Sequence, residues 1–347
     1  MLEIRGRRIM QGAMRAAVLT AFDAPLTIRK DQPVPEPGPG QIRIRMHASG
    51  VCGTDIHVWH GHFPVKTPLV LGHEPVGTVD ALGPGVTDLR IGDRVGVSWS
   101  QKGCGRCGHC QRHHERFCAT ATTWMELGGG HCEFMIAESQ GCNLIPDGLD
   151  WADAAPMFCA GYTVMSGYRN ARPRPGERFA VIGIGGLGHL AVQVCKAMGH
   201  EVIAITGSAG KRDEARALGA DDVLVVHEHA GTELMAMGGV DVVISTSNSM
   251  TQNSQVLAGL RVGGRLVTMA AGNQPIHFDP LMGLGQQIEL IGSRQDERAD
   301  LVDVLELAAK GKVRPKLETY ALEEVNRLME RQRDGLVRYR GVLLLDR

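Results

Sequence analysis

The chain has 347 residues, of which 22% are charged, and its 37 Lys and Arg residues against 38 Asp and Glu residues leave a formal net charge of −1. This length exceeds one ordinary domain and favours two, each long enough to bury a core. A near-neutral chain has no basic field to hold nucleic acid, and charged residues or histidine interrupt every apolar stretch before it is long enough to cross a bilayer. We therefore expect a soluble protein without nucleic-acid or membrane partners.

The chain begins with a short extension and continues as a β-rich region. Residues 1–12 lack the apolar stretch of a secretory signal, and Glu3 is untypical of a transit peptide, so we expect them to lie outside the fold. Short runs rich in β-formers then predict strands over residues 18–22, 26–29, 42–48, 75–80 and 93–97. The Pro-Gly cluster at residues 33–40 predicts a surface connection between two of them.

A first candidate metal site lies within this β-rich region. Cys52 opens the run Cys-Gly-Thr-Asp-Ile-His, and His73 follows in Gly-His-Glu. Zinc prefers cysteine sulfur and histidine nitrogen, and a catalytic zinc keeps one position open, so three protein ligands have to converge. Cys52 and His73 are two candidates, and Cys159, just before the chain changes character, is the third.

A second candidate metal site is more local. Cys104, Cys107, Cys110 and Cys118 place four thiols within one Gly-rich loop. Four thiolates form a closed tetrahedral shell with no place for water, which predicts a structural zinc. This clustering of the nine cysteines favours metal binding in a reducing compartment, so we expect a cytoplasmic protein. The cysteines without partner spacing are expected to be buried small side chains: Cys132, Cys142 and Cys195.

After Cys159 the pattern alternates between strand and helix. The apolar run at residues 178–182 is followed by a G-x-G-x-x-G turn, and an amphipathic segment at residues 187–198 comes next. A glycine turn between a strand and a helix is typical of dinucleotide binding, because it lets the backbone and the helix N-terminus approach a pyrophosphate. The expected cofactor-binding residues of this turn are Gly183, Gly185, Gly186, Leu187 and Gly188.

The remaining elements complete a doubly wound parallel sheet of the Rossmann type. Further strands are predicted at residues 201–206, 223–226, 240–245, 265–269 and 288–291. Helices at residues 301–310 and 322–331 and a strand at residues 341–345 follow. The fold class is therefore α/β, with a Rossmann domain beside a β-rich domain.

These motifs together resemble the zinc-containing alcohol dehydrogenases of the medium-chain family, in particular NADP-preferring members of the cinnamyl-alcohol type. The likeness runs from about Met14 to the C-terminus. It implies a chaperonin-10-like catalytic domain at residues 1–161, a nucleotide-binding domain at residues 162–296, and a return to the catalytic domain at residues 297–347. It also implies a homodimer or homotetramer acting on a small alcohol or aldehyde.

The resemblance implies that a zinc on Cys52, His73 and Cys159 stabilises negative charge on the substrate oxygen. Glu74 would neighbour the metal, and Asp55 would support one of its ligands.

Proton transfer and substrate selection are implied in the same way. Thr54 would hold the alcohol proton, and His57 would pass it to solvent through the cofactor ribose. Phe63 and Trp99 would narrow the substrate pocket, which favours primary or aromatic alcohols, although ordinary core packing explains two rings nearly as well. His60, His62 and His131 have no such support and are expected to be surface or pocket residues.

The cofactor prediction rests on the end of the second Rossmann strand. NAD enzymes usually carry Asp or Glu there to bind the ribose. This chain has no carboxylate between the end of that strand, at Thr206, and Asp213. Thr206 and Ser208 offer hydroxyl groups, and Lys211 and Arg212 offer charges suited to a 2′-phosphate. A solvated helix face is the alternative for this basic pair, but the missing carboxylate favours NADP(H).

Three other functions stay open at this level. An NAD-dependent secondary-alcohol or polyol dehydrogenase would share every motif, because substrate choice depends on pocket shape. A zinc-free quinone reductase of the same superfamily and a non-enzymatic nicotinamide-binding redox sensor both predict a broken ligand set. The intact ligand set argues against these last two.

Overall fold

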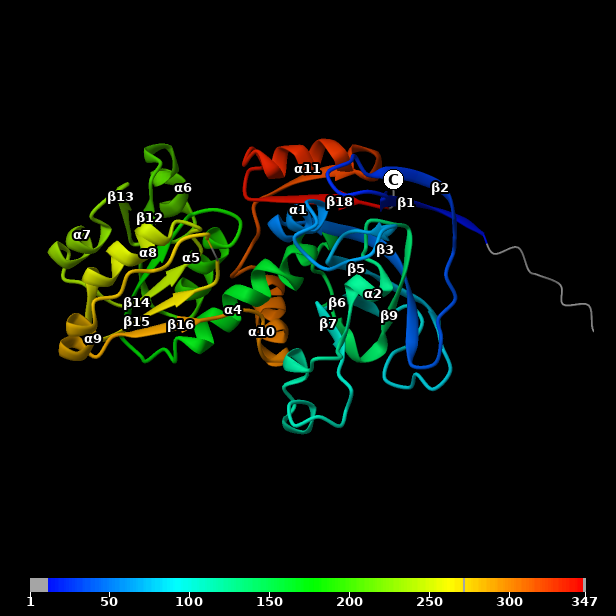
Figure 1. Cartoon of the computed structure of the whole chain (residues 1–347), viewed down its shortest axis with the longest axis horizontal. Helices are drawn as coiled ribbons and strands as arrows, with labels where there is room; N and C mark the ends of the chain where they lie inside the picture. The colour runs from blue at the N-terminus through cyan, green and yellow to red at the C-terminus, as the bar shows by residue number, and fades with distance from the viewer. Residues whose placement is uncertain (1–11, 271, 346–347) are drawn as a thin grey trace, which may run out of the picture. The chain divides into compact units, whose positions relative to one another are not determined.

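The computed structural model describes residues 12–270 and 272–345 (Figure 1), so residues 1–11 of the predicted extension lie outside the described part. The chain divides into two compact units. The first unit is β-rich and comprises Met1–Leu144, Thr319–Leu336 and Val342–Arg347, and the second comprises Ile145–Glu318 and Val337–Gly341. Among the described residues, no helix has both the length and the apolar character needed to span a bilayer.

The β-rich unit is built on a seven-stranded sheet with the order β10-β6-β5-β3-β18-β17, in which β9 also pairs with β3. The small sheets β2-β1-β4 and β7-β8 accompany it. The strands are β1 (Ala13–Leu19), β2 (Thr27–Pro33), β3 (Gln41–Val51), β4 (Leu69–Val70), β5 (Glu74–Leu82), β6 (Arg94–Val97), β7 (Ser100–Lys102), β8 (Thr122–Thr123), β9 (Phe134–Glu138), β10 (Cys142–Leu144), β17 (Leu317–Ala321) and β18 (Arg340–Leu344). The α-helices are α1 (Gly53–Trp59), α2 (Trp124–Leu127) and α11 (Val325–Arg333), and the 3-10 helices are η1 (Cys110–Arg112), η2 (Glu115–Phe117), η3 (Ser139–Gly141) and η7 (Leu322–Glu324).

Strand β3 is the centre of this unit. Its alternate residues Ile42, Ile44 and Met46 are buried, as the two-residue period of a strand requires. It pairs antiparallel with β5, and this register sets Gly50 opposite Glu74. The end of β3 therefore delivers the chain into α1 beside the start of β5, which is where the first candidate metal ligands lie.

The second unit contains a six-stranded parallel sheet with the order β13-β12-β11-β14-β15-β16. Counted along the chain, this is the order 3-2-1-4-5-6 of a dinucleotide-binding domain. Its strands are β11 (Arg178–Ile182), β12 (Glu201–Thr206), β13 (Asp222–Val225), β14 (Val240–Ser245), β15 (Leu260–Thr268) and β16 (Glu289–Gly292). Its helices are α3 (Trp151–Ala154), η4 (Ala155–Phe158), α4 (Ala160–Asn170), α5 (Gly188–Ala197), η5 (Ala209–Lys211), α6 (Arg212–Ala217), α7 (Ala230–Ala236), α8 (Met250–Val256), η6 (Leu257–Gly259), α9 (Pro280–Gln286) and α10 (Arg298–Ala309).

Helices cover both faces of this parallel sheet, as its continuous apolar strands require. On one face Ala180 and Ile182 of β11 share a buried cluster with Leu234 of α7. On the other face Phe179 contacts Tyr168 of α4, with ring centroids 5.8 Å apart. The predicted strands at residues 178–182, 201–206 and 240–245 match β11, β12 and β14.

The predicted domain boundaries differ from those of the compact units. Residues 145–161 and 297–318 belong to the second unit rather than to the β-rich one. The reason is packing, because α10 lies against α4 and the Ser166 hydroxyl donates a hydrogen bond of 2.7 Å to the buried Asp300 carboxylate. Such a contact between positions 134 residues apart has no local sequence signal. The first predicted strand, at residues 18–22, is also displaced, since β1 spans Ala13–Leu19.

Candidate metal and cofactor sites

The first candidate metal site is organised by the buried carboxylate of Asp55, in the first turn of α1. Its Oδ2 accepts a hydrogen bond of 2.8 Å from the Cys52 backbone N–H. Its Oδ1 accepts one of 3.2 Å from the Gly72 N–H and lies 3.2 Å from Nδ1 of His73. One carboxylate therefore ties the start of α1 to the start of β5. A proton on Nδ1 of His73 leaves the Nε2 lone pair available for a metal.

The ligand atoms of Cys52, His73 and Glu74 lie within 4.8 Å of one another. His73 Nε2 is buried and has no hydrogen-bond partner in the described part of the chain. A buried polar atom without a partner is costly, and a metal would satisfy it. Burial lowers the pKa of His73, but the neighbouring Asp55 carboxylate and Cys52 sulfur raise it above its ordinary value overall. This donor set fits zinc.

The predicted third ligand, Cys159, belongs to the second unit and is the N-cap residue of α4. Its assignment to the same zinc as Cys52 and His73 remains a prediction.

Two glycines make room for the closely packed side chains of this site. A Cβ on Gly50 would lie 1.9 Å from a carboxylate oxygen of Glu74, so only glycine leaves room for that buried side chain. Gly72 has a φ of +102°, and a Cβ there would meet Nδ1 of His131 at 2.4 Å. A side chain at either position would displace a group of the candidate site.

His131 is a supporting residue that the sequence did not reveal. It is fully buried, whereas a surface or pocket position was expected, and its Nδ1 lies 2.9 Å from the Ser49 hydroxyl. Burial lowers the pKa of His131 to about 4, so the ring is neutral near neutral pH. The only local signal is the preceding Gly-Gly-Gly run, which brings the backbone close to Gly72.

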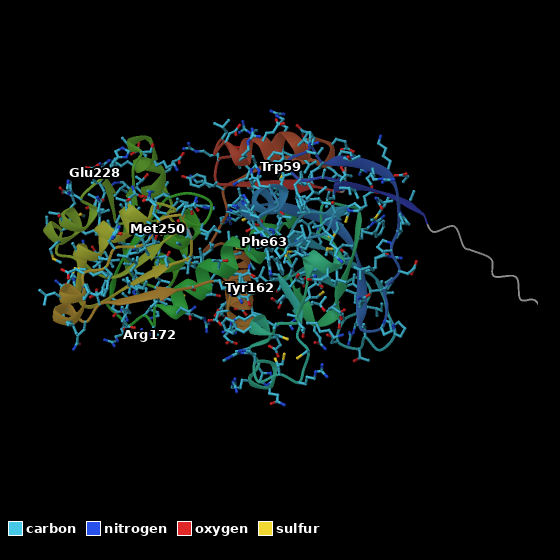
Figure 2. The ribbon with its side chains drawn as sticks, in the orientation of Figure 1. Trp59, Phe63, Tyr162, Arg172, Glu228 and Met250 are labelled. Carbon is cyan, nitrogen blue, oxygen red and sulfur yellow. The ribbon has the colours of Figure 1, made fainter. Side chains whose placement is uncertain are left out.

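Aromatic rings surround His73. The Trp99 ring centroid lies 5.5 Å from that of His73, and the Trp124 centroid lies 5.9 Å from it. Phe63, labelled in Figure 2, lies 5.9 Å from Trp99, so the structure brings the two predicted pocket residues together. Trp124 was missed because a single tryptophan gives no local clue to partners that lie far away in the chain.

The two residues of the predicted proton relay lie on α1. The Thr54 hydroxyl is 4.0 Å from the Cys52 sulfur, close to the candidate metal ligands. His57, one turn later, is exposed, and its Nδ1 lies 3.1 Å from Nδ1 of His62. A hydroxyl beside the metal ligands and a solvated imidazole on one helix suit a path for a proton from a buried site to water.

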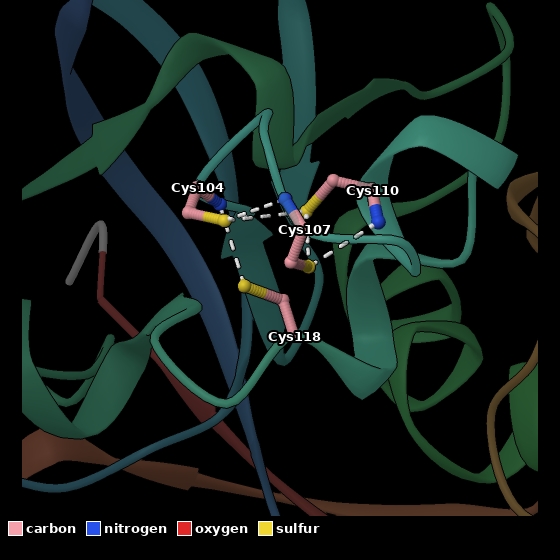
Figure 3. Close-up of side chains that lie close together, drawn as sticks. All are labelled: Cys104, Cys107, Cys110 and Cys118. Atoms are coloured by element: carbon pink, nitrogen blue, oxygen red, sulfur yellow. Dashed lines mark hydrogen bonds between the residues drawn. The ribbon is translucent and has the colours of Figure 1, made fainter.

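The four clustered cysteines converge in a single loop (Figure 3). Sulfur atoms at about 2.3 Å from a tetrahedral zinc are about 3.8 Å apart. The Cys107 and Cys110 sulfurs are 3.5 Å apart, and those of Cys104 and Cys110 are 4.0 Å apart. Backbone N–H groups also point at the thiols, since the Cys104 N–H donates to Cys118 and the Cys107 N–H donates to Cys104, both at 3.4 Å.

Electrostatics explain why this cluster suits a cation. Backbone N–H groups of Cys104 and Thr120 lower the pKa of Cys118 to about 6, whereas burial raises the pKa of Cys110 to about 12. Four neighbouring thiolates would repel one another without a cation, and a divalent metal removes that repulsion. The set offers only sulfur and is closed, which fits a structural zinc.

The glycine turn of the second unit has the backbone geometry of a tight turn between a strand and a helix. Gly183 has a φ of +89°, which permits the tight turn after β11. A Cβ on Gly188 would lie 1.9 Å from the Gly183 carbonyl oxygen, so glycine is needed for the helix to pack there. A Cβ on Gly185 would meet nothing within 4 Å, which leaves open space beside the backbone. This arrangement suits a pyrophosphate.

The residues expected at the ribose end of the cofactor lie where β12 ends. The Thr206 hydroxyl accepts a hydrogen bond of 3.2 Å from the Ser208 N–H. Lys211 donates from Nζ to the Ile184 carbonyl, 2.8 Å away in the glycine turn, whereas Arg212 donates to the Val223 carbonyl at 3.2 Å. Of the two cations, Lys211 is therefore nearer to the expected path of a dinucleotide.

His189, the second residue of α5, also escaped sequence reasoning. It is fully buried, its Nδ1 lies 3.0 Å from the Gly185 carbonyl, and its Nε2 accepts a hydrogen bond of 3.2 Å from the Lys316 N–H. Both ring nitrogens are therefore occupied. The ring connects the glycine turn to a segment 127 residues away.

Comparisons with known proteins match both halves of the chain. The family model described as "Alcohol dehydrogenase GroES-like domain" matches residues 38–147, and the one described as "Zinc-binding dehydrogenase" matches residues 186–310. An alcohol dehydrogenase of Geobacillus stearothermophilus is 37% identical over 96% of this chain and 100% of its own length. These matches confirm the expected fold, a GroES-like domain with a Rossmann domain.

Solved structures of alcohol dehydrogenases and of a reductase are similar to this chain over almost its whole length. A cinnamyl alcohol dehydrogenase from Sorghum bicolor is 30% identical with a TM-score of 0.85, covering 95% of this chain and 97% of that one. A cobalt- and zinc-bound alcohol dehydrogenase from Pyrobaculum aerophilum is 28% identical, with a TM-score of 0.83 and coverage of 96% and 100%. An acetophenone reductase from Geotrichum candidum in complex with NAD is 28% identical, with a TM-score of 0.83 and coverage of 96% and 97%.

The identity over almost the whole length of the relative goes beyond shared architecture, and the resemblance carried by the cysteine, histidine and glycine motifs is confirmed. The chain belongs to the zinc-containing alcohol dehydrogenases of the medium-chain family.

Proposed function

We propose that this oxidoreductase exchanges a hydride between a primary or aromatic alcohol and NADP, and that it also runs in reverse as an aldehyde reductase. Cys52, His73 and Cys159 would hold a zinc that, when bound, polarises the substrate oxygen. The observation that supports this most is the buried Nε2 of His73, which has no hydrogen-bond partner among the described residues and lies beside Cys52 and Glu74.

The chain's own groups would hold and move the proton. Asp55 keeps His73 in the tautomer that presents Nε2, through the contact at Nδ1. The Thr54 hydroxyl, 4.0 Å from the Cys52 sulfur, would accept the proton of the alcohol, and His57 would carry it towards solvent. Thr54→Val should lower kcat by about 10²–10⁴ while zinc content stays unchanged. Thr54→Ser, which keeps the hydroxyl, is the control, and unchanged turnover in Thr54→Val would contradict the relay.

The proposed substrate class is supported by the aromatic rings beside His73. Phe63, Trp99 and Trp124 offer flat apolar faces with a T-shaped contact between the two indoles, whose centroids are 5.7 Å apart. Such walls favour flat or slender substrates over polyhydroxylated ones, because a polyol would leave hydroxyl groups without partners. A panel of primary, aromatic, secondary and polyol substrates tests this. The highest kcat/KM for a polyol would favour the alternative of a polyol dehydrogenase.

NADP is proposed because the end of β12 has no carboxylate to repel a 2′-phosphate, and because Lys211 lies over the glycine turn. The competing candidate is an NAD-dependent enzyme, as in the acetophenone reductase complex. Measuring kcat/KM with NADPH and NADH decides between them. Lys211→Ala should reduce the efficiency with NADPH about tenfold and leave NADH almost unaffected, as expected for the loss of one charge-assisted contact.

A matched control is available on α6, the helix that follows Lys211. Arg216→Ala removes a cation of α6 that is engaged with Asp222, and it should leave the NADPH to NADH ratio unchanged. A preference for NADH in the wild type, or an unchanged ratio in Lys211→Ala, would overturn the cofactor assignment.

A further inference from the structure

Helix α1 ends in a backbone motif that fixes two histidines relative to each other. His60 is the C-cap residue and Gly61 follows with a φ of +72°. The His62 N–H donates to the His57 carbonyl at 2.9 Å, and the Gly61 N–H donates to the Val58 carbonyl at 3.0 Å. These two bonds define a Schellman motif, in which the residue after the left-handed glycine returns to contact the third residue from the helix end. Those two positions are His62 and His57.

The side-chain contact between these positions is polar. Schellman motifs usually bury an apolar pair there, but Nδ1 of His57 lies 3.1 Å from Nδ1 of His62, with ring centroids 5.4 Å apart. In a hydrogen bond between two Nδ1 atoms, one ring donates and the other accepts. The Nε2 atoms of both rings then remain available for other partners, and both residues are exposed to water.

The charged groups near His57 and His62 contact other residues. The His60 ring stacks on His62 at 5.6 Å, but its Nδ1 lies 2.5 Å from the Asp23 carboxylate. Asp23 in turn is fixed by its N–H, which donates to the Trp59 carbonyl at 3.0 Å. From α11, the guanidinium of Arg333 lies over the Trp59 ring at 5.8 Å. The acidic group at this helix end is therefore engaged by His60.

We propose that His62 is a positioning residue of the proton relay, a second imidazole that accepts a proton from His57. This rests on the proposed function, in which the proton of the alcohol reaches His57. A proton binds Nε2 of His57, its Nδ1–H bond breaks as a new N–H bond forms at Nδ1 of His62, and Nε2 of His62 releases its proton to water. Both rings end neutral with their tautomers exchanged, and no electron is transferred.

The contact has two expected consequences for kinetics. Since the two rings would pass one proton between their Nδ1 atoms, the pH profile of kcat should change when His62 is removed. Removing His62 leaves His57 to pass protons directly to buffer, which should slow turnover several-fold, less than the roughly 10²–10⁴-fold that a general acid–base group contributes.

The experiment compares pH profiles of kcat for the wild type with His57→Asn, His62→Asn, the double variant, and His60→Asn as the matched control on the same helix end. We expect His62→Asn to lower kcat several-fold, to shift the profile, and to be rescued by free imidazole. The second substitution should have no further effect in the His57→Asn background. His60→Asn should retain the wild-type profile, because its partner is Asp23.

The possible outcomes distinguish the role of His62 from the proton relay through His57. An impaired His57→Asn beside a His62→Asn variant with the wild-type rate and profile overturns the role of His62 alone. A lower kcat and a lower melting temperature in His62→Asn, without a shift in the profile or rescue by imidazole, overturns it as well, since a purely structural role explains that result. An unchanged His57→Asn overturns the relay of the proposed function itself.

Discussion

The two candidate metal sites are built in opposite ways. The thiols of Cys104, Cys107, Cys110 and Cys118 come from one loop, and backbone N–H groups of that same loop donate to them. The site around His73 combines residues from the start of α1 and the start of β5 with a buried carboxylate between them. The thiolate loop supports its ligands through the local backbone, and the site around His73 supports them through the Asp55 side chain.

This difference decides what each site can do. A closed set of four thiolates leaves no position for a substrate, and its value is the loop that it folds. A site with fewer ligands, held by Asp55 and surrounded by aromatic rings, keeps space for chemistry. We therefore expect damage to the thiolate loop to appear mainly as lost stability and damage to the site around His73 mainly as lost activity.

The largest effect is expected from Cys107→Ser. Metal binding supplies about 10–16 kcal/mol in small zinc domains, as much as the whole stability of many proteins. Losing even about 3 kcal/mol of it would lower the melting temperature by about 10 °C, which calorimetry and zinc analysis would show together. Cys132→Ser is the control for replacing a thiol by a hydroxyl, because Cys132 belongs to neither cluster. A variant that folds normally and loses only turnover would refute the structural role.

The next largest effect is expected from Cys52→Ala, which should reduce activity far more than stability. The variant should bind one zinc per chain instead of two and lose about 10³-fold or more in kcat/KM, while its melting temperature changes by only a few degrees. Elemental analysis of both variants gives the answer. One zinc in the wild type that survives Cys52→Ala and disappears in Cys107→Ser would mean that the site of His73 carries no metal in the purified protein.

A smaller effect is expected from removing the charge of Asp55. This side chain supports the ligands of one site, whereas backbone groups support the thiolates of the other. Asp55→Asn keeps the shape of the side chain but removes its charge, so zinc affinity at the site around His73 should fall about 10–100-fold. Competition with a chelator measures this, and the thiolate zinc should be retained because backbone groups support it. Asp300→Asn, another buried carboxylate, serves as the control. Equal loss of both zincs in Asp55→Asn would contradict the distinction.

The smallest effect concerns a buried imidazole that is not a predicted ligand. Both nitrogens of His189 are occupied, and burial lowers its pKa to about 3. Because the unfolded chain binds this proton near pH 6.5, stability should fall as pH drops below that value, by about 2 kcal/mol between pH 7 and pH 5. Urea unfolding at both pH values should show that His189→Gln reduces this dependence. An identical pH dependence in the variant would refute the assignment.

The sequence revealed the parts of the molecule that local contacts determine. The four clustered cysteines and the glycine turn from Gly183 to Gly188 depend on short spacing, and the strands at residues 178–182 and 240–245 depend on local apolar runs. His131, Trp124 and His189 were missed because their partners lie far away in the chain. The grouping of residues 297–318 with the second compact unit depends on an equally distant contact, since α10 is held by α4.

Strand β18 has a consequence for synthesis on the ribosome. Strand β9 and the preceding Glu133 cover one edge of β3 as far as Met46. The rest of that edge is covered only when the C-terminal strand β18 has been made and pairs with β3, where the Leu345 N–H donates to the His47 carbonyl at 3.0 Å. The chain emerges from its N-terminus, so all six strands of the parallel sheet are made while the central sheet of the β-rich unit still has this open edge. Nascent or prematurely terminated chains that end before Arg340 would expose it, and an uncovered edge next to apolar residues such as Met46 invites pairing between chains.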